Sequence, residues 1–170
     1  MMGRFSGWTS ESAYDATHRA PAKKKKGKAP VRAVNVRAYD AIIGIDPGTK
    51  TGIAVKSEGL LKIVSTEKAW RAHQIVREWA EYYNGNILVR VEDARQRQWF
   101  GDTGRERMKG AGSVERDCRI WEEMLTDLGI PFEMVHPKNV KATTAEQFKK
   151  ITGCTVRTSI HAREAAWLII

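Results

Sequence analysis

The sequence contains little cysteine and no long hydrophobic run. Cys118 and Cys154 are the only cysteines among 170 residues, and the four histidines are scattered, so we expect neither a disulfide framework nor a Cys/His zinc site. No apolar stretch reaches the roughly 18 residues that a membrane-spanning helix needs. We therefore expect an intracellular protein, cytoplasmic or nucleoid-associated, with reduced cysteines that pack in its core, and not a membrane protein.

Positive charge is concentrated at the start of the chain. The formal net charge is +9, and the first 40 residues contain nine Lys or Arg against three Asp or Glu. Lys23, Lys24, Lys25 and Lys26 stand among Pro, Ala and Gly, without a helical or strand period. We predict a basic, largely disordered arm over residues 1–39 that contacts phosphates, and one compact domain over residues 40–170. A nuclear-import signal and a solubilising tail are alternative interpretations of these lysines.

Acidic residues follow two predicted strands at the points where those strands end. Residues 41–45 form a short apolar run that Pro47-Gly48 stops, which leaves Asp46 at the strand exit. Residues 86–91 form a second such run, and Glu92 and Asp93 follow it. Asp before Pro-Gly is also an ordinary turn former. We favour Glu92 as the functional carboxylate and expect Asp93 to cap the segment that follows.

A third group of candidate ligands lies near residue 160. A helix is expected to begin at Thr158 or Ser159, and His161 and Glu164 then share one face with Cβ atoms about 5 to 6 Å apart. Each residue alone could be a cap or a solvated side chain. Together, carboxylates and an imidazole from three separate elements suit hard divalent cations with positions left open for water and phosphate.

The remaining pattern predicts an α/β fold. Apolar positions alternate with turn and cap residues in an order that favours a mixed sheet with helices on its faces. The expected elements are antiparallel strands over residues 52–56 and 60–65 around Gly59, a helix after Thr66 that Gly85 ends, a helix from Ser113 with Val114, Cys118, Trp121, Leu125 and Leu128 in register, a strand over residues 130–135, and a shorter helix after a capping box in residues 143–147.

These motifs resemble those of RuvC-type Holliday-junction resolvases, which are nucleases of the ribonuclease H-like fold. Residues 44–48 (Gly-Ile-Asp-Pro-Gly) resemble the family's first strand with its catalytic Asp, and Val91-Glu92 resembles the strand-end Glu. Residues 131–141 resemble the fifth-strand segment with its Val-Lys pair, and residues 161–165 resemble the terminal acidic pair. The familiar pair is Asp-x-x-Asp, whereas this chain has His161 and Glu164; some members carry His at the first position.

The resemblance implies a mixed five-stranded sheet with helices on both faces and two-metal phosphodiester hydrolysis. Two Mg²⁺ ions, for which Mn²⁺ substitutes, would be bridged by Asp46 and flanked by Glu92 and Glu164. His161 would ligate a metal or orient the attacking water, and Lys141 would add positive charge at the transition state. It further implies a homodimer that nicks four-way DNA junctions and other branched DNA. The short divergent form fits a phage or mobile-element member, active in the host cytoplasm, as well as a cellular one.

A stretch without a clean period, residues 95–112, separates Glu92 from the predicted helix at Ser113. Its Arg and Lys residues suit phosphates, and Trp99 with Phe100 suit stacking on unpaired bases, although packing inside the protein is the alternative. The expected DNA contacts are Arg95, Arg97, Trp99, Phe100, Arg105, Arg107, Lys109, Lys138, Lys141 and the lysines 23–26. Two other functions remain open: a catalytically weak or silent branched-DNA-binding protein, and a ribonuclease-like relative that acts on RNA.

Overall fold

The computed structural model describes residues 38–96, 105–140 and 143–170, with only the backbone described for residues 105–111. The elements within these described ranges belong to the unit Asn35–Ile170. The strands are β1 (Ala41–Asp46), β2 (Lys50–Ser57), β3 (Leu60–Lys68), β4 (Ile87–Glu92) and β5 (Phe132–Val135). The helices are α1 (Ala69–Tyr82), α2 (Arg105–Asp127), α3 (Ala145–Thr152) and α4 (Ile160–Trp167), with 3-10 turns η3 (Ala94–Gln96) and η4 (Pro137–Asn139).

The five strands form one mixed sheet in the order β3-β2-β1-β4-β5. β1, β2 and β3 are antiparallel neighbours, and β4 and β5 add to β1 in parallel. Glu58 and Gly59 both have positive φ, at 53° and 76°, as the two-residue turn of a β-hairpin requires. The parallel strands need long crossovers, which α1 and α2 supply. The predicted hairpin around Gly59 is confirmed.

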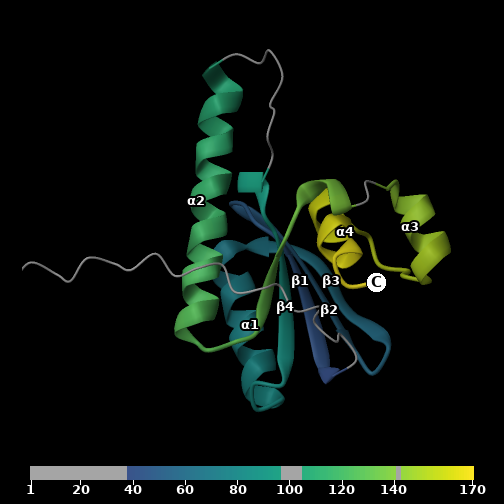
Figure 1. The fold of residues 1–170 in the computed structure, drawn as a ribbon. Coiled ribbons are helices and arrows are strands. Elements are labelled where there is room, and N and C mark those ends of the chain that lie inside the picture. Colours follow the sequence, from purple (N-terminus) through teal and green to yellow (C-terminus); the bar gives the residue numbers. More distant parts are fainter. Residues whose placement is uncertain (1–37, 97–104, 141–142) are drawn as a thin grey trace, which may run out of the picture. The chain divides into compact units, whose positions relative to one another are not determined.

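The sheet is covered on both faces, as predicted. Figure 1 shows α1 and α2 on one side of the sheet and α4 on the other. The main core fills the first side, where branched side chains of the strands meet residues of α1 and α2. Its fully buried members include Ile43, Ile45, Ile53, Val55, Ala72, Val76, Val89, Val91, Trp121 and Leu125. The prediction of a ribonuclease H-like, mixed five-stranded α/β fold is confirmed.

The start of α2 corrects the sequence-based expectation. We expected residues 95–112 to lack a period and the helix to begin at Ser113, but α2 already begins at Arg105. Gly110 and Gly112 hide the helical pattern, since each costs about 1 kcal/mol relative to Ala. A helix with 23 residues tolerates that cost because Trp121 and Leu125 in its later turns pack into the core against the sheet. The predicted DNA contacts Arg105, Arg107 and Lys109 therefore lie on a helix.

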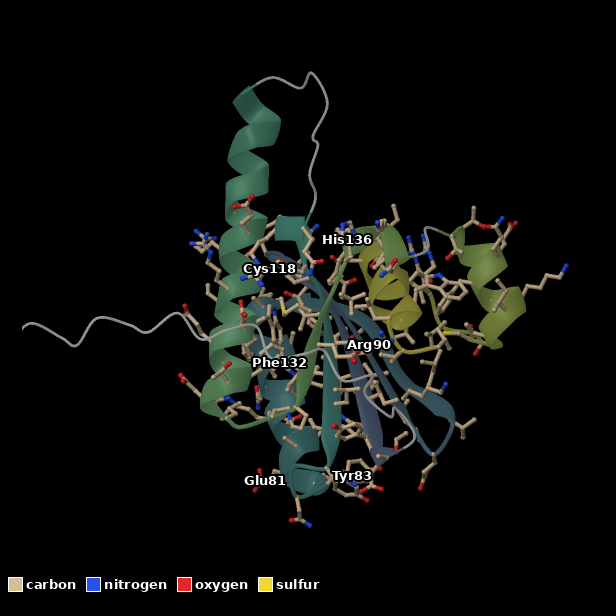
Figure 2. All side chains as sticks on the ribbon, in the orientation of Figure 1. Glu81, Tyr83, Arg90, Cys118, Phe132 and His136 are labelled. Atoms are coloured by element: carbon tan, nitrogen blue, oxygen red, sulfur yellow. The ribbon has the colours of Figure 1, made fainter. Side chains whose placement is uncertain are left out.

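The inner face of α2 otherwise agrees with the predicted register. Cys118, labelled in Figure 2, faces the sheet, and its thiol donates to the Glu92 backbone carbonyl at 3.5 Å. Burial raises the pKa of the Cys118 thiol to about 11, which fits an unreactive packing residue. Leu128 was expected in the same buried row but lies 40% exposed, because α2 ends one residue earlier.

The C-terminal elements follow their local signals closely. The predicted capping box is confirmed, because Thr144 and Gln147 exchange side-chain and backbone hydrogen bonds at the start of α3. Ser159 caps α4 by accepting from the backbone N–H of Ala162 at 3.0 Å. β5 begins at Phe132 rather than at residue 130. Within the described ranges, no helix is both long and apolar enough to cross a membrane.

Candidate functional site

β1 delivers Asp46 to one end of the sheet and holds it there. The strand is buried along its whole length, so its last residue is fixed by packing on both faces. The turn after it is closed by a 2.6 Å hydrogen bond from Thr51 Oγ1 to the Gly48 carbonyl. Because β4 runs parallel to β1 with Ile45 beside Val91, Glu92 stands next to Asp46 at the same end. Both carboxylates are buried.

Two glycines allow α4 to lie directly on the sheet. A β-carbon at Gly52 would lie 2.1 Å from the His161 carbonyl oxygen, and one at Gly44 would lie 2.0 Å from the Ala165 carbonyl oxygen. These distances are far below any tolerable contact, so only glycine admits the helix this closely. Gly52 is the direct neighbour of Asp46 in the β1–β2 ladder. The close approach therefore places the first turn of α4 above Asp46.

The result is a compact group formed by Asp46, His161 and Glu164. His161 Nδ1 lies 2.7 Å from Asp46 Oδ2 and 3.9 Å from Glu164 Oε2. One potential ligand atom from each residue fits within 4.8 Å of the others. The His161 side chain is 51% exposed, so the group opens to solvent on that side while Asp46 forms its buried base.

Electrostatics indicate that this group suits a cation. Burial, followed by the charges of Glu92 and, more weakly, Glu164, raises the pKa of Asp46 from 3.8 to about 7, although the hydrogen bond from His161 opposes the rise. A neighbouring divalent ion would oppose this rise, because its charge would compensate three carboxylates at once and favour ionised Asp46. The three carboxylates are oxygen donors of the kind that Mg²⁺ and Mn²⁺ prefer, and the imidazole can orient a water beside the ion. The residues therefore fit the metals that the sequence motifs imply.

Glu92 lies beside Asp46 but does not belong to the group of three residues whose ligand atoms converge. Its charge acts on Asp46, yet the three residues whose ligand atoms converge are Asp46, His161 and Glu164. Asp93 serves a different purpose, as expected. Its carboxylate accepts from the backbone and guanidinium of Arg95 and from Gln96 Nε2 at 3.2 Å. Burial alone would raise the pKa of Asp93, but these hydrogen bonds outweigh it and hold the pKa below its usual value.

The predicted DNA contacts are only partly visible. Arg95 is held between Asp93 at 2.6 Å and Glu122 at 2.6 Å, so its charge is already compensated inside the protein. Lys138 is exposed in η4. Some of the other predicted contacts lie outside the described residues: Lys23, Lys24, Lys25, Lys26, Arg97, Trp99, Phe100 and Lys141. For Arg105, Arg107 and Lys109, the structure describes only the backbone. Their roles stay predictions.

Sequence reasoning missed the residues that hold α4 in place. Arg163 is buried and donates to the Thr143 carbonyl and the Thr158 carbonyl, each at 2.9 Å. Trp167 Nε1 donates to Thr143 Oγ1 at 2.8 Å. At the other end of the helix, Arg90 of β4, labelled in Figure 2, donates to the Leu168 carbonyl and pairs with Glu133 at 2.8 Å. Little in the sequence signals Arg163, which stands between Ala162 and the candidate ligand Glu164.

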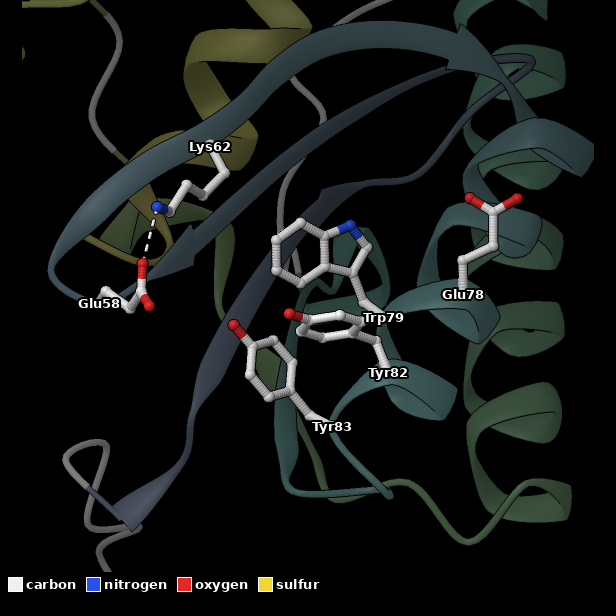
Figure 3. A pocket seen from close by; sticks show the side chains of 6 residues that line it. All are labelled: Glu58, Lys62, Glu78, Trp79, Tyr82 and Tyr83. Carbon is white, nitrogen blue, oxygen red and sulfur yellow. Dashed lines mark hydrogen bonds and ion pairs between the residues drawn. The ribbon is translucent and has the colours of Figure 1, made fainter.

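A separate pocket of about 420 Å³ lies away from this group (Figure 3). It is lined by Glu58, Lys62, Glu78, Trp79, Tyr82 and Tyr83. Ser57, which precedes Glu58, pairs with Ala41 at the start of β1, whereas Asp46 ends that strand. The pocket is thus at the opposite end of the sheet and takes no part in the carboxylate group.

Comparison with known proteins supports the fold. No family model matches the chain, and no curated protein sequence matches it. Among solved structures, it is similar to RuvC from T. thermophilus in complex with a Holliday junction substrate, with a TM-score of 0.50 and 21% identity. The match covers 76% of this chain and 90% of that one. At this identity the likeness shows a shared fold.

Proposed function

We propose that this protein is a metal-dependent endonuclease that nicks four-way DNA junctions. The observation that supports this most strongly is the convergence of Asp46, His161 and Glu164 within 4.8 Å, with Glu92 beside them, at one end of the sheet. The solved RuvC structure with a similar fold contains a Holliday junction substrate. A site of this chemistry on this fold favours phosphodiester hydrolysis of branched DNA.

Bound divalent metals would supply charge neutralisation and an activated water. The chain's own residues prepare the site for them. Asp46, fixed at the end of β1, faces both Glu92 and the first turn of α4. When neutral His161 donates from Nδ1 to Asp46, its Nε2 keeps a lone pair that can accept a proton or bind a metal. Glu164 and Glu92 lie on different sides of Asp46, one on the helix and the other on β4.

Lys141 is proposed to add positive charge near the reacting phosphate. Two described residues near it in the chain are Val140, the C-cap of η4, and Thr143, which Arg163 and Trp167 hold to α4. Thr143 is therefore tied to the helix that carries His161 and Glu164. A lysine there would stabilise the extra negative charge of the transition state.

The test uses the full chain with four-way junction, fork, linear duplex and RNA substrates, with and without Mg²⁺ or Mn²⁺. Nicking of the junction that requires metal and is lost in Asp46→Asn, with junction binding retained, supports the proposal. Metal-independent cutting, or cutting by Asp46→Asn at the wild-type rate, contradicts the site assignment. Binding without cutting would identify a silent junction-binding protein, and preferential cutting of RNA would identify a ribonuclease.

A further inference from the structure

Two lysines face each other at the end of the β2–β3 hairpin that is nearest the carboxylate group. Lys50, the first residue of β2, and Lys68, the last of β3, are direct partners in the antiparallel ladder. Both are exposed, and neither forms an ion pair with any residue that the structure describes. Like charges directly opposite one another destabilise a sheet. In the isolated protein, this pair therefore destabilises the sheet, and no ion pair with a described residue offsets the repulsion.

The lysine pair lies on the same face of the sheet as the carboxylate group. Side chains alternate along a strand, so Lys50 shares its face with Gly52, which lies under His161. Lys68 shares its face with Thr66, whose Oγ1 is hydrogen-bonded to the Oγ of Ser159, the cap of α4. Both strands thus direct their lysines toward the side that α4 occupies.

The register of the strands also defines the spacing between the lysine pair and the carboxylate group. Gly52 is the partner of Asp46 in β1 and of Thr66 in β3. The lysine pair is two residues further along both strands, or roughly 7 Å at the usual rise of a strand. Successive nucleotides advance about 3.4 Å along one strand of a duplex. Along the strand direction, this offset matches one or two nucleotides beyond a phosphate held at Asp46, with Lys50 one strand and Lys68 two strands away from β1.

We propose that Lys50 and Lys68 bind the backbone phosphates of the DNA strand being cut, beside the phosphate that reacts. This inference rests on the proposed function, since it assumes that DNA occupies the Asp46 site. A lysine ammonium is a compact charge that binds phosphate without reading a base. Phosphates bound to the two lysines would also offset their mutual repulsion. The pair would position the strand, while Asp46, Glu92, His161 and Glu164 act on it.

The experiment measures junction binding at several salt concentrations in an Asp46→Asn background, so that cutting does not interfere. The test variant is Lys50→Gln with Lys68→Gln. The control is Lys56→Gln with Lys149→Gln, which removes the same charge from the far end of β2 and from α3. A third variant, Lys50→Arg with Lys68→Arg, retains the charge.

We expect the test variant to bind about tenfold more weakly at 0.1 M salt and to lose roughly 1.8 from the slope of log affinity against log salt, at about 0.9 for each phosphate contact. The control should change the slope by less than half as much, and the Arg variant should restore it. Thermal unfolding of the test variant should be unchanged or shifted upward, because a repulsive pair has been removed. A slope equal to that of the control would overturn the inference.

Failure of the inference and failure of the proposed function give different results. If the wild type does not cut junctions in Mg²⁺ but the slope falls in the test variant, the nuclease assignment is wrong and the lysine site stands. If the wild type cuts and the slope is unaffected, the nuclease stands and the lysine site is wrong. A wild type that binds no junction overturns both.

Discussion

Gly52 and the backbone of His161 are in direct contact, with no room between strand and helix for a side chain. The missing β-carbon of Gly52 would lie 2.1 Å from the His161 carbonyl oxygen. Since Gly52 is also the ladder partner of Asp46, this one contact sets how close α4, with His161 and Glu164, lies to Asp46.

Gly52→Ala should therefore damage both stability and activity. The new methyl group meets backbone rather than a flexible side chain, so α4 must move and carry His161 and Glu164 away from Asp46. We expect a loss of about 1 to 3 kcal/mol in the free energy of unfolding and loss of metal-dependent cutting. Gly112→Ala is the control: nothing lies near that position in α2, so stability should rise by up to about 1 kcal/mol. Equal effects of the two substitutions would contradict this account.

The stability of the metal-free protein should fall as pH rises toward neutrality. Asp46 has a pKa of about 7 in the folded protein and 3.8 as its reference value, so the folded state holds the proton more tightly. The stabilisation of the folded state by the protonated Asp46 is fully present below pH 3.8 and is lost as the pH rises through 7. The full difference is at most about 4 kcal/mol, at about 1.4 kcal/mol per pKa unit.

Chemical denaturation in EDTA at pH 5 and pH 8 measures this effect. Asp46→Asn should be more stable than wild type at pH 8, and its free energy of unfolding should depend less on pH. Asp127→Asn, on the exposed end of α2, should leave the pH dependence of the free energy of unfolding unchanged. The depressed pKa of Asp93 acts in the opposite direction but only at lower pH, where that carboxylate becomes protonated. The lowered pKa of half-buried His73 also acts in the opposite direction between pH 5 and neutrality, so the comparison of variants decides: an Asp46→Asn variant with the same pH dependence of stability as the wild type would refute the assignment.

Adding Mg²⁺ or Mn²⁺ should raise the melting temperature of the wild type. A ligand at 100 times its dissociation constant stabilises the folded state by about 2.7 kcal/mol. Asp46→Asn should abolish this shift, and His161→Ala should reduce it, because both contribute to the converging ligand atoms. Differential scanning fluorimetry with metal titrations tests this without a DNA substrate. A shift of wild-type size in Asp46→Asn would place the metal elsewhere.

The basic arm and the aromatic residues should affect binding in different ways. Deletion of residues 1–30 should weaken duplex and junction binding alike and flatten the salt dependence, since lysines on an arm meet any phosphate backbone. Replacing Trp99 and Phe100 by Ala should instead lower the junction-to-duplex affinity ratio, because stacking is cheapest where bases are already unpaired. Loss of junction preference from the deletion alone would show that this division is wrong.

Paired cuts on opposing strands require two active sites, so we predict a two-fold dimer. The resemblance to RuvC-type resolvases suggests α2 as its interface, and Ile120 on that helix is 42% exposed. Ile120→Glu should shift the dimer toward monomer in sedimentation experiments. Ile151→Glu on α3, where the side chain is 57% exposed, serves as the control. A wild-type protein that is monomeric on and off junction DNA would refute the prediction.

Local signals predicted most of the fold. The strand ends at Asp46 and Glu92, the hairpin at Gly59 and the capping box at Thr144 depend on neighbouring residues, and each was found where expected. The start of α2 was missed because two glycines interrupt its pattern, and packing that stabilises the helix is remote in sequence.

The sequence named the residues of the candidate group, but it did not indicate the residues that hold that group in place. Asp46, His161 and Glu164 could be named from motifs, and the structure brings them together. The need for Gly52 could not be foreseen, because a strand glycine indicates close approach without indicating what approaches. The opposition of Lys50 and Lys68 likewise depends on the register of β2 against β3, which includes an irregularity between Val55 and Lys56.

The separation of Asp46 and His161 along the chain has a consequence for folding kinetics. The β1–β2–β3 meander uses contacts between near neighbours, and such local contacts form early because they close short loops. Asp46 and His161 are 115 residues apart, so their hydrogen bond closes one of the longest loops in the domain. We expect the meander to gain protection from hydrogen exchange before α4 docks. Competence to bind metal would then be acquired late in folding, after most of the sheet has formed.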